Sequence, residues 1–109
     1  RKQLKPVTSK RLATGDLTLD LETRQVSGPR GLLTKPMSPR SFSLLRFLME
    51  HPGEALPRDK ILTEVWGESF SNPNSLEKEI GRLRGLLKDT RKLIIRTVPG
   101  VGYLLDGRP

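Results

Sequence analysis

The sequence predicts an α+β domain in which short antiparallel strands come first, three helices follow and a β-hairpin closes the chain. Between residues 12 and 34, apolar residues recur with a period of two, as in half-buried strands. From residue 38 to 88 the spacing changes to three and four, which is the period of amphipathic helices. A β-branched segment at 93–98 then precedes a Pro-Gly turn and a second apolar segment, and together they indicate a hairpin.

The composition is that of one small basic domain. The chain has 109 residues, enough for a single modest core. Its 20 Lys and Arg against 12 Asp and Glu give a formal net charge of +8. Such an excess favours a polyanionic partner, most commonly nucleic acid, although ribosomal, membrane-surface and heparin-binding proteins share it. The absence of Cys excludes disulfides, thiolate metal sites and a Cys nucleophile.

We expect no enzymatic activity, no cofactor and no metal site. The one histidine, His51, precedes Pro52-Gly53 and fits the last turn of a helix, where a cation interacts well with the helix dipole. The sequence contains no P-loop, Gly-rich dinucleotide turn or metal-ligand spacing. No apolar run approaches the ~20 residues that cross a bilayer, and no signal-peptide pattern opens the chain, so we expect a cytoplasmic protein.

The first third of the chain divides into a linker and a set of strands. Residues 1–11 carry five cations and one Pro, which predicts a flexible basic linker, with a DNA-binding arm as the alternative. Residues 12–109 form the domain. Strands at about 12–35 are predicted as three or four short antiparallel segments, because Leu17, Leu19 and Leu21 alternate with polar residues and Gly-rich turns separate the segments.

Two helices follow. The first, at about 38–51, begins at Ser38-Pro39, because Ser caps free N–H groups and Pro suits the first helical position. Its apolar stripe is Phe42, Leu45, Leu48 and Met49, broadened by Leu44 and Phe47. The second, at about 57–66, opens at Pro57 and ends at Gly67. Its apolar residues are Ile61, Leu62, Val65 and Trp66.

The third helix, at about 73–88, is the element around which the chain is organised. Its apolar residues, which share one face, are Leu76, Ile80, Leu83 and Leu87. On the opposite face lie Ser75, Lys78, Arg82 and Gly85, with Glu79 beside them. A DNA recognition helix has this arrangement, and so has any helix with a solvated outer face. Either Asn74 caps the helix together with Glu77, or Pro73 is its first residue.

Two glycines interrupt the outer face of this helix. Gly81 and Gly85 each cost roughly 1 kcal/mol relative to Ala in a helix interior. Either a close neighbour on that face accounts for the two glycines, or they arose by chance.

After the helix, the hairpin at about 93–105 has the position of a wing. Strands, three helices and a terminal hairpin are the order of a winged helix-turn-helix.

Several motifs occur in a fixed order along the chain. They are Leu33-Thr34-Lys35-Pro36-Met37-Ser38-Pro39 with Phe42, Leu44, Leu45 and Leu48; His51-Pro52-Gly53; Leu62 with Val65-Trp66-Gly67; Ile80, Arg82-Leu83-Arg84 and Leu87; and Thr97-Val98-Pro99-Gly100-Val101-Gly102-Tyr103. With these motifs the chain resembles the OmpR/PhoB family of bacterial response-regulator output domains. The resemblance covers residues 33–103, and the upstream strands fit the N-terminal sheet of that family.

The resemblance implies a mode of action. The third helix would enter the major groove of DNA and the hairpin the adjacent minor groove, typically as a head-to-tail pair on direct-repeat half-sites. The loop at 67–73 matches a segment that contacts RNA polymerase in several relatives; its candidates are Glu68, Ser69, Phe70 and Ser71. Activation normally follows phosphorylation of an upstream receiver domain. No receiver lies within these 109 residues, so we expect an isolated effector domain.

The resemblance also implies DNA-binding residues. On the third helix they are Asn74, Ser75, Lys78, Glu79, Arg82 and Arg84; on the wing Arg96, Thr97, Pro99, Gly100 and Tyr103; and at the start of the second helix Arg58, for the DNA backbone. Arg82 faces outward and is the best candidate for a base-edge or phosphate contact. Arg84 lies nearer the core and would hold a phosphate, with a salt bridge as its alternative. Tyr103 is either a wing contact or a hydrophobic plug.

The sequence departs from the family pattern at several positions. Lys78 and Glu79 stand where many relatives carry a small apolar residue and a His. On a groove-facing surface, Glu79 would repel phosphate unless it accepts a hydrogen bond from a cytosine amino group. Pro99 replaces the Arg that several relatives insert into the minor groove. Ser41 and Pro57 replace usual capping residues, which concerns stability.

The sequence is compatible with three functions. The first is sequence-specific binding to duplex DNA that regulates transcription. The second is a protein-interaction module that kept the scaffold but lost DNA, a reading favoured by Glu77, Glu79 and Pro99. The third is a general RNA-binding or ribosome-associated basic domain, which lacks the exposed aromatic platforms of single-strand recognition. A steep fall of DNA affinity with salt would argue against the second function.

Overall fold

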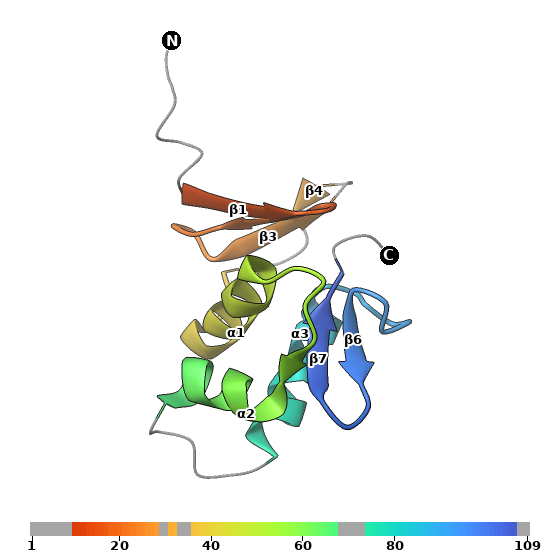
Figure 1. The fold of residues 1–109 in the computed structure, drawn as a ribbon. Helices are drawn as coiled ribbons and strands as arrows, with labels where there is room; N and C mark the ends of the chain where they lie inside the picture. Colours follow the sequence, from red (N-terminus) through yellow and green to blue (C-terminus); the bar gives the residue numbers. More distant parts are fainter. Residues whose placement is uncertain (1–9, 29–30, 33–35, 68–73, 107–109) are drawn as a thin grey trace.

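A computed structural model describes residues 10–28, 31–32, 36–67 and 74–106. In chain order its elements are β1 (Arg11–Thr14), β2 (Leu17–Asp20), β3 (Gln25–Gly28), β4 (Gly31–Leu32), α1 (Pro39–Glu50), β5 (Leu56–Pro57), α2 (Arg58–Ile61), the π-helical η2 (Leu62–Trp66), α3 (Ser75–Leu86), β6 (Ile95–Val98) and β7 (Gly102–Leu105). The N-terminal sheet covers one end of the helices, and the β6–β7 hairpin stands beside them (Figure 1). The predicted α+β winged helix-turn-helix is confirmed.

The N-terminal sheet is antiparallel, with the strand order β1-β2-β3-β4. Leu19 in β2 lies opposite Leu12 in β1 and Val26 in β3, so one face of the sheet is apolar and packs on the helices. Thr14 donates a hydrogen bond through its hydroxyl to the carbonyl oxygen of Met49, which joins the sheet to α1. Arg11 begins β1, and residues 1–9 of the expected linker lie outside the described residues.

Helix α1 begins as its sequence predicts. The side chain of Ser38 accepts a hydrogen bond from the backbone N–H of Ser41, and Pro39 is the first helical residue. The helix ends at Glu50, and His51 is its C-terminal cap. Its completely or almost completely buried apolar residues are Leu44, Leu45, Leu48 and Met49. Phe42 and Phe47 are only partly buried, so the stripe is narrower than the apolar pattern predicts.

The second helix differs from its prediction at the start. Pro57 does not open it; Pro57 extends a two-residue strand, β5, that pairs with β7, and the helix begins at Arg58. From Leu62 the turn widens to a π-helix that ends at Trp66, and Gly67 is its C-terminal cap with a positive φ of 59°, which glycine adopts most readily. Trp66 is buried in the core, as predicted. Its neighbour Arg40 donates a hydrogen bond to the carbonyl oxygen of Val65.

Helix α3 buries the predicted stripe. The relative exposures of Leu76, Ile80, Leu83 and Leu87 are 2% or less. The expected reciprocal cap at the start of the helix does not form, because Asn74 makes no side-chain cap hydrogen bond and Glu77 pairs with Arg58 instead. The buried stripe therefore holds α3 in place, and its opposite face is left outward.

The C-terminal sheet has the strand order β5-β7-β6 and forms the wing. Thr97 lies opposite Tyr103, and Val98 opposite Gly102. Gly102 also faces β5 so closely that a Cβ there would lie 2.1 Å from the carbonyl oxygen of Leu56. Only glycine fits this contact, which brings the wing against the start of α2. Within the described ranges, no helix has the length and apolar content that crossing a bilayer requires.

Candidate nucleic-acid interface

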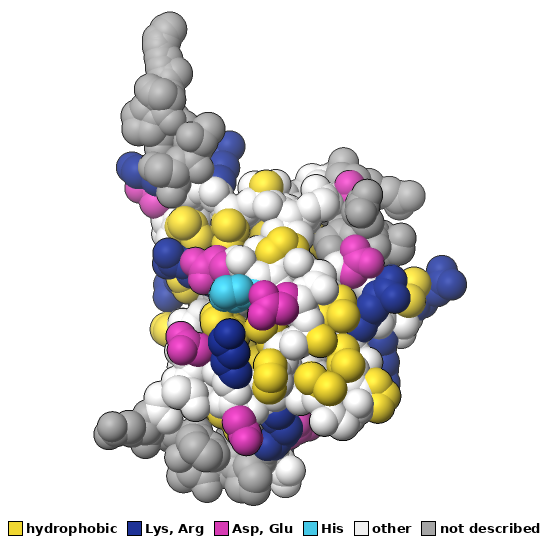
Figure 2. Space-filling model, in the orientation of Figure 1, with side chains coloured by type: hydrophobic (Ala, Val, Ile, Leu, Met, Phe, Trp, Pro, Cys, Tyr) yellow, Lys and Arg dark blue, Asp and Glu magenta, His cyan; other side chains and the backbone are white. Residues whose placement is uncertain are grey.

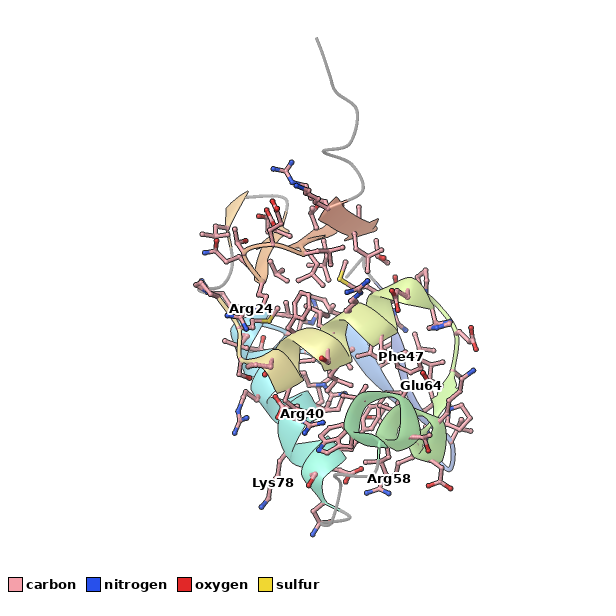
Figure 3. The ribbon with its side chains drawn as sticks, turned by 90° about the vertical axis from the view of Figure 1, so that its left-hand side faces the viewer. Arg24, Arg40, Phe47, Arg58, Glu64 and Lys78 are labelled. Atoms are coloured by element: carbon pink, nitrogen blue, oxygen red, sulfur yellow. The ribbon has the colours of Figure 1, made fainter. Side chains whose placement is uncertain are left out.

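The outward face of α3 carries two long cationic side chains. Lys78 is exposed, and the side chain of Arg82 is 62% exposed one turn further along the helix. Lys78 points away from the body of the protein, at the end opposite the N-terminal sheet (Figure 3). Gly81 and Gly85 are exposed beside Arg82, and beyond the adjacent residues and the backbone of α3 itself, no atom of the described residues lies within 4 Å of the position that a Cβ would take at either. The face therefore has Lys78 and Arg82 standing above a low surface.

No neighbour within the described protein explains the two glycines, although a close neighbour was one prediction for this face. Their Cα atoms are open to solvent, so any close partner must come from outside the described protein. Asn74 is exposed and Ser75 is half-buried at the N-terminal end of the same face. Together with Lys78 and Arg82, these residues form one continuous surface along α3.

Glu79 does not belong to that surface, and the expectation that it faces a groove is wrong. Its side chain is only 8% exposed. One carboxylate oxygen accepts a hydrogen bond from the hydroxyl of Ser41 in the first turn of α1, with 2.5 Å between the oxygens. The other accepts one from Nη1 of Arg82 at 3.1 Å. The carboxylate is turned inward because a partner from a different helix draws it there.

Arg84 also differs from its expected role. Its Nε and Nη2 donate hydrogen bonds to the carbonyl oxygen of Ile95, at 3.1 and 2.7 Å, and Nη2 also donates to the hydroxyl of Thr97 at 3.1 Å. Its guanidinium lies over the ring of Tyr103, 5.9 Å from the centroid. Neither the expected phosphate contact nor the alternative salt bridge describes this arrangement. Arg84 joins α3 to both strands of the wing.

Arg58 joins the start of α2 to the first turn of α3. Its Nε and Nη2 donate to the two carboxylate oxygens of Glu77, at 2.8 and 2.9 Å. This hydrogen bond is the main reason that the pKa of Glu77 is lowered. Tyr103 is buried, and its burial, followed by the nearby Glu77 carboxylate, raises the pKa of its phenol. The hydrophobic-plug alternative therefore describes the ring of Tyr103.

The tip of the wing is uncharged. Pro99, Gly100 and Val101 are exposed, and Val98 is half-buried. Apolar side chains gather over the hairpin in the view of Figure 2. Arg96, further along β6, is exposed but donates to the carboxylate of Asp106 at 3.2 Å. An open groove of about 620 Å³ is lined by the wing, the start of α2 and Glu77.

Sequence reasoning missed Asp89, which sets the path from α3 into the wing. Its carboxylate is buried and accepts hydrogen bonds from the backbone N–H groups of Leu93, Ile94 and Ile95, at 2.9, 3.1 and 2.9 Å. A charged residue followed by a polar turn carries no sequence signal for this role. Because Ile95 begins β6, Asp89 determines where the wing starts relative to α3.

The predicted site residues thus fall into two groups. An outward surface gathers Asn74, Ser75, Lys78 and Arg82, with Thr97, Pro99 and Gly100 on the wing. A supporting layer holds Arg58, Glu79, Arg84 and Tyr103 in contacts within the protein, and Arg96 pairs at its edge. The loop candidates Glu68, Ser69, Phe70 and Ser71 lie outside the described residues. Among the described residues, no cluster of three or more His, Cys, Asp or Glu side chains could hold a metal ion.

An N-terminal sheet, three helices with a cationic third helix and a hairpin wing define the winged helix-turn-helix class. Residues 34–105 match the family described as "Transcriptional regulatory protein, C terminal". The chain belongs to this family, whose members include response regulators of the OmpR/PhoB type.

Similar proteins agree with this assignment. The transcriptional regulatory protein CusR of Escherichia coli is 42% identical over 95 residues, which are 84% of this chain and 40% of CusR. The DNA-binding domain of Klebsiella pneumoniae RstA, solved in complex with the RstA box, superposes with a TM-score of 0.77 at 30% identity, covering 91% of this chain and 99% of that one. DrrB of Thermotoga maritima, an OmpR/PhoB homologue, gives 0.74 at 27% identity, covering 94% and 48%. The chain therefore spans well under half the length of CusR.

Proposed function

We propose that this chain binds duplex DNA with sequence specificity and regulates transcription as the output domain of a response regulator. Helix α3 enters the major groove, and the β6–β7 wing lies along the adjacent minor groove. The observation that carries the proposal is the outward surface of α3, where Lys78 and Arg82 stand exposed on a helix held by a fully buried stripe. A major groove about 12 Å wide admits such a helix.

The low surface around Arg82 supports this mode of binding. Gly81 and Gly85 remove the side chains that would otherwise stand beside it. A base pair in the groove can therefore approach the helix backbone closely, and the Arg82 guanidinium can reach a base edge. Arg pairs best with the O6 and N7 atoms of guanine, so we expect a guanine in each half-site.

The remaining contacts are with the DNA backbone. Asn74 and Ser75, at the N-terminal end of α3, offer an amide and a hydroxyl to phosphate, and the positive end of the helix dipole adds to this attraction. Thr97 and Gly100 on the wing offer a hydroxyl and backbone N–H groups. Arg58, Arg84 and Tyr103 act mainly as supports, because their polar or aromatic groups already have partners within the protein.

The internal pairing of the acidic residues favours DNA over the protein-interaction alternative. Glu77 and Glu79 are the acidic residues of α3, and an acidic surface there would repel phosphate. However, Glu77 pairs with Arg58 and Glu79 with Arg82, and Glu79 is buried. The outward surface that remains is cationic and polar, which suits a polyanion.

Two relatives support a proposal for the wider role of the protein. RstA was solved on its DNA box, and CusR is named a transcriptional regulatory protein. By analogy, we propose that the chain acts in the cytoplasm as a head-to-tail pair on direct-repeat half-sites and contacts RNA polymerase. In a longer protein, an upstream receiver domain would control it through phosphorylation.

Selection of bound duplexes from a random-sequence pool, followed by footprinting, tests the proposal. We expect enrichment of a repeated half-site, with protection of a major groove and of the minor groove beside it. Affinity for the selected duplex should fall steeply with salt, because each neutralised phosphate releases counterions. No enrichment over several rounds, or binding that is independent of salt, would contradict the proposal.

A further inference from the structure

A buried carboxylate lies directly behind the most exposed arginine of α3. Glu79 is 6% exposed and joins two side chains with very different surroundings. On its inner side is Ser41, which is 1% exposed. On its outer side is Arg82, whose side chain is 62% exposed. Charged residues are almost never buried unless paired, so the burial of this carboxylate depends on its two partners.

The inner contact fastens Glu79 to the beginning of α1. Ser38 caps this helix, donates through its hydroxyl to that of Ser41, and Ser41 in turn donates to Glu79. The first turn of α1 contains no acidic residue of its own. The positive end of a helix dipole favours a carboxylate at this place, and Glu79 supplies one from α3. Its inner oxygen is therefore held by a fixed element of the core.

The outer contact restrains Arg82. Nη1 donates to the second carboxylate oxygen of Glu79 at 3.1 Å, across one turn of the same helix. The guanidinium is a planar fork with five N–H donors, so fixing one corner limits the directions that the others take. An exposed arginine without such a partner samples many rotamers and follows any nearby phosphate. Arg82 presents its free donors from a position set by α1.

We propose that Glu79 is a positioning residue for Arg82. Held by its hydrogen bond with Ser41, Glu79 fixes one corner of the Arg82 guanidinium. The remaining N–H donors then read a base edge and bind nonspecific phosphates less well. This inference rests on the proposed function. Restraining Arg82 before binding lowers the entropy that specific binding must overcome. The nearby negative charge also weakens attraction to phosphate in general. Glu79 thus raises discrimination between sequences at some cost in overall affinity.

The test compares Glu79→Gln, Arg82→Ala and the double variant with the wild-type chain. Glutamine has nearly the same shape and still accepts a hydrogen bond from Ser41, but it removes the charge that holds Arg82. Glu64→Gln is the matched control, because Glu64 is an exposed acidic residue on η2 that forms no ion pair within the described residues. The probes are a duplex of the selected sequence and a scrambled duplex of the same length, titrated over a range of KCl concentrations. Thermal unfolding checks that each variant is folded.

For Glu79→Gln we expect the ratio of the two affinities to fall about tenfold, within the range of one lost arginine–base contact. Binding to the scrambled duplex should become stronger and its salt dependence steeper by about 0.9 in the double-logarithmic slope, since the freed Arg82 takes up one more phosphate. In the Arg82→Ala background the same change should leave the ratio unaltered. Glu64→Gln should leave the ratio and both slopes almost unchanged.

Ser41→Ala tests the inner side of the clamp without altering any charge. It should lower the affinity ratio in the same direction, by about threefold, because Glu79 keeps its pair with Arg82 but loses its fixed position. A ratio unchanged by both variants would overturn the inference, and so would an equal loss of both affinities by Glu79→Gln that persists without Arg82. A wild-type chain that does not distinguish the two duplexes would instead overturn the proposed function.

Discussion

Arg84 of α3 grips the carbonyl oxygen of Ile95, the first residue of β6, with two N–H groups at 3.1 and 2.7 Å. The helix and the wing are therefore not independent. A single guanidinium on the inner edge of α3 sets how far the hairpin stands from the helix. Any ligand that spans both elements meets a distance fixed before it binds.

Replacing Arg84 with alanine should loosen the wing more than the core. The carbonyl oxygen of Ile95 would lose both donors, and a hydrogen bond to a charged partner is worth about 1.5–3 kcal/mol. Because the site is partly exposed, we expect a loss near the lower end, about 1 kcal/mol. Amide hydrogen exchange should rise in β6 and β7 while α1 stays protected. Arg84→Lys cannot reproduce the two-donor geometry and should restore little. Uniform loss of protection across all elements would contradict this view.

Gly102→Ala should be strongly destabilising, because its Cβ would lie 2.1 Å from the carbonyl oxygen of Leu56 and 2.8 Å from the backbone N of Arg58. Both are backbone atoms, so strand β5 or the wing must move. We expect a loss of at least about 2 kcal/mol in urea unfolding, as for other overpacked sites.

Gly85→Ala is the matched control for that substitution. It adds the same methyl group in open space on α3 and should stabilise the fold by up to about 1 kcal/mol. If the proposed DNA contact is correct, this more stable variant should bind the selected duplex less well. Equal stability changes at Gly85 and Gly102 would show that the close contact with β5 does not matter.

Asp89→Asn should destabilise the chain because it weakens three hydrogen bonds at once. The carboxylate accepts from three backbone N–H groups, whereas an amide has one oxygen and presents N–H donors to the rest. We expect a loss of about 2 kcal/mol in denaturant unfolding, since a buried N–H left without an acceptor costs about 1–3 kcal/mol. Asp16→Asn, at an exposed turn, should have little effect. Similar stability of the two variants would refute this role for Asp89.

The Arg58–Glu77 pair should make stability depend on pH in the acid range. The pKa of Glu77 is lowered, mainly by its hydrogen bond with Arg58. A carboxyl group whose pKa is lower when folded stabilises the fold above its unfolded pKa, about 4.3, and loses this as the pH falls through the folded pKa. The Glu77 side chain is 42% exposed, so the effect should stay below about 1 kcal/mol.

Urea unfolding between pH 3 and 6 measures this dependence. Glu77→Gln should make the free energy of unfolding less dependent on pH below about pH 4.3, because the variant lacks the carboxyl group that titrates there. Asp20, whose pKa is also lowered, chiefly by hydrogen bonds from the backbone N–H of Thr23 and then of Glu22, contributes in the same direction. Asp20→Asn therefore serves as a comparison. Parallel curves for wild type and Glu77→Gln would exclude a stabilising pair.

Arg82→Ala and Lys78→Ala should have different effects on DNA binding. Loss of Arg82 should weaken binding to the selected duplex by about 1–3 kcal/mol and weaken nonspecific binding much less. Loss of Lys78, an exposed point charge, should weaken both and reduce the salt slope by about 0.9. Competition titrations with the selected and a scrambled duplex separate the two. Equal losses on both duplexes for Arg82→Ala would reduce Arg82 to a phosphate contact.

Much of the fold was predictable because it depends on local periodicity. The apolar spacings of α1 and α3, the Ser38-Pro39 start and the alternation in β2 all act over a few residues. Strand β5 was not predictable, since two residues ending in Pro carry no strand pattern and pair only because β7 approaches them. The start of α2 was not predictable either, because Pro57 belongs to β5 and the helix begins only at Arg58.

The candidate site was predictable only on its outward surface. A helical projection places Lys78 and Arg82 outward, and they are exposed. It also places Glu79 near them, yet Ser41, 38 residues earlier in the chain, draws that carboxylate inside. Likewise Arg84 and Asp89 act on backbone atoms of β6 that a projection of α3 does not contain. Position on a helix predicts direction, but partners from other elements decide burial.

The uncharged wing tip has a consequence for how binding energies are measured. Residues 98–102 carry no ionisable group, so contacts that they make displace no ions. Varying the ionic strength would then change only the part of the binding free energy that the helices and flanking segments contribute, whereas the contribution of the hairpin tip would stay constant. A titration series in potassium chloride thus separates the contributions of these two parts of the protein surface without a substitution.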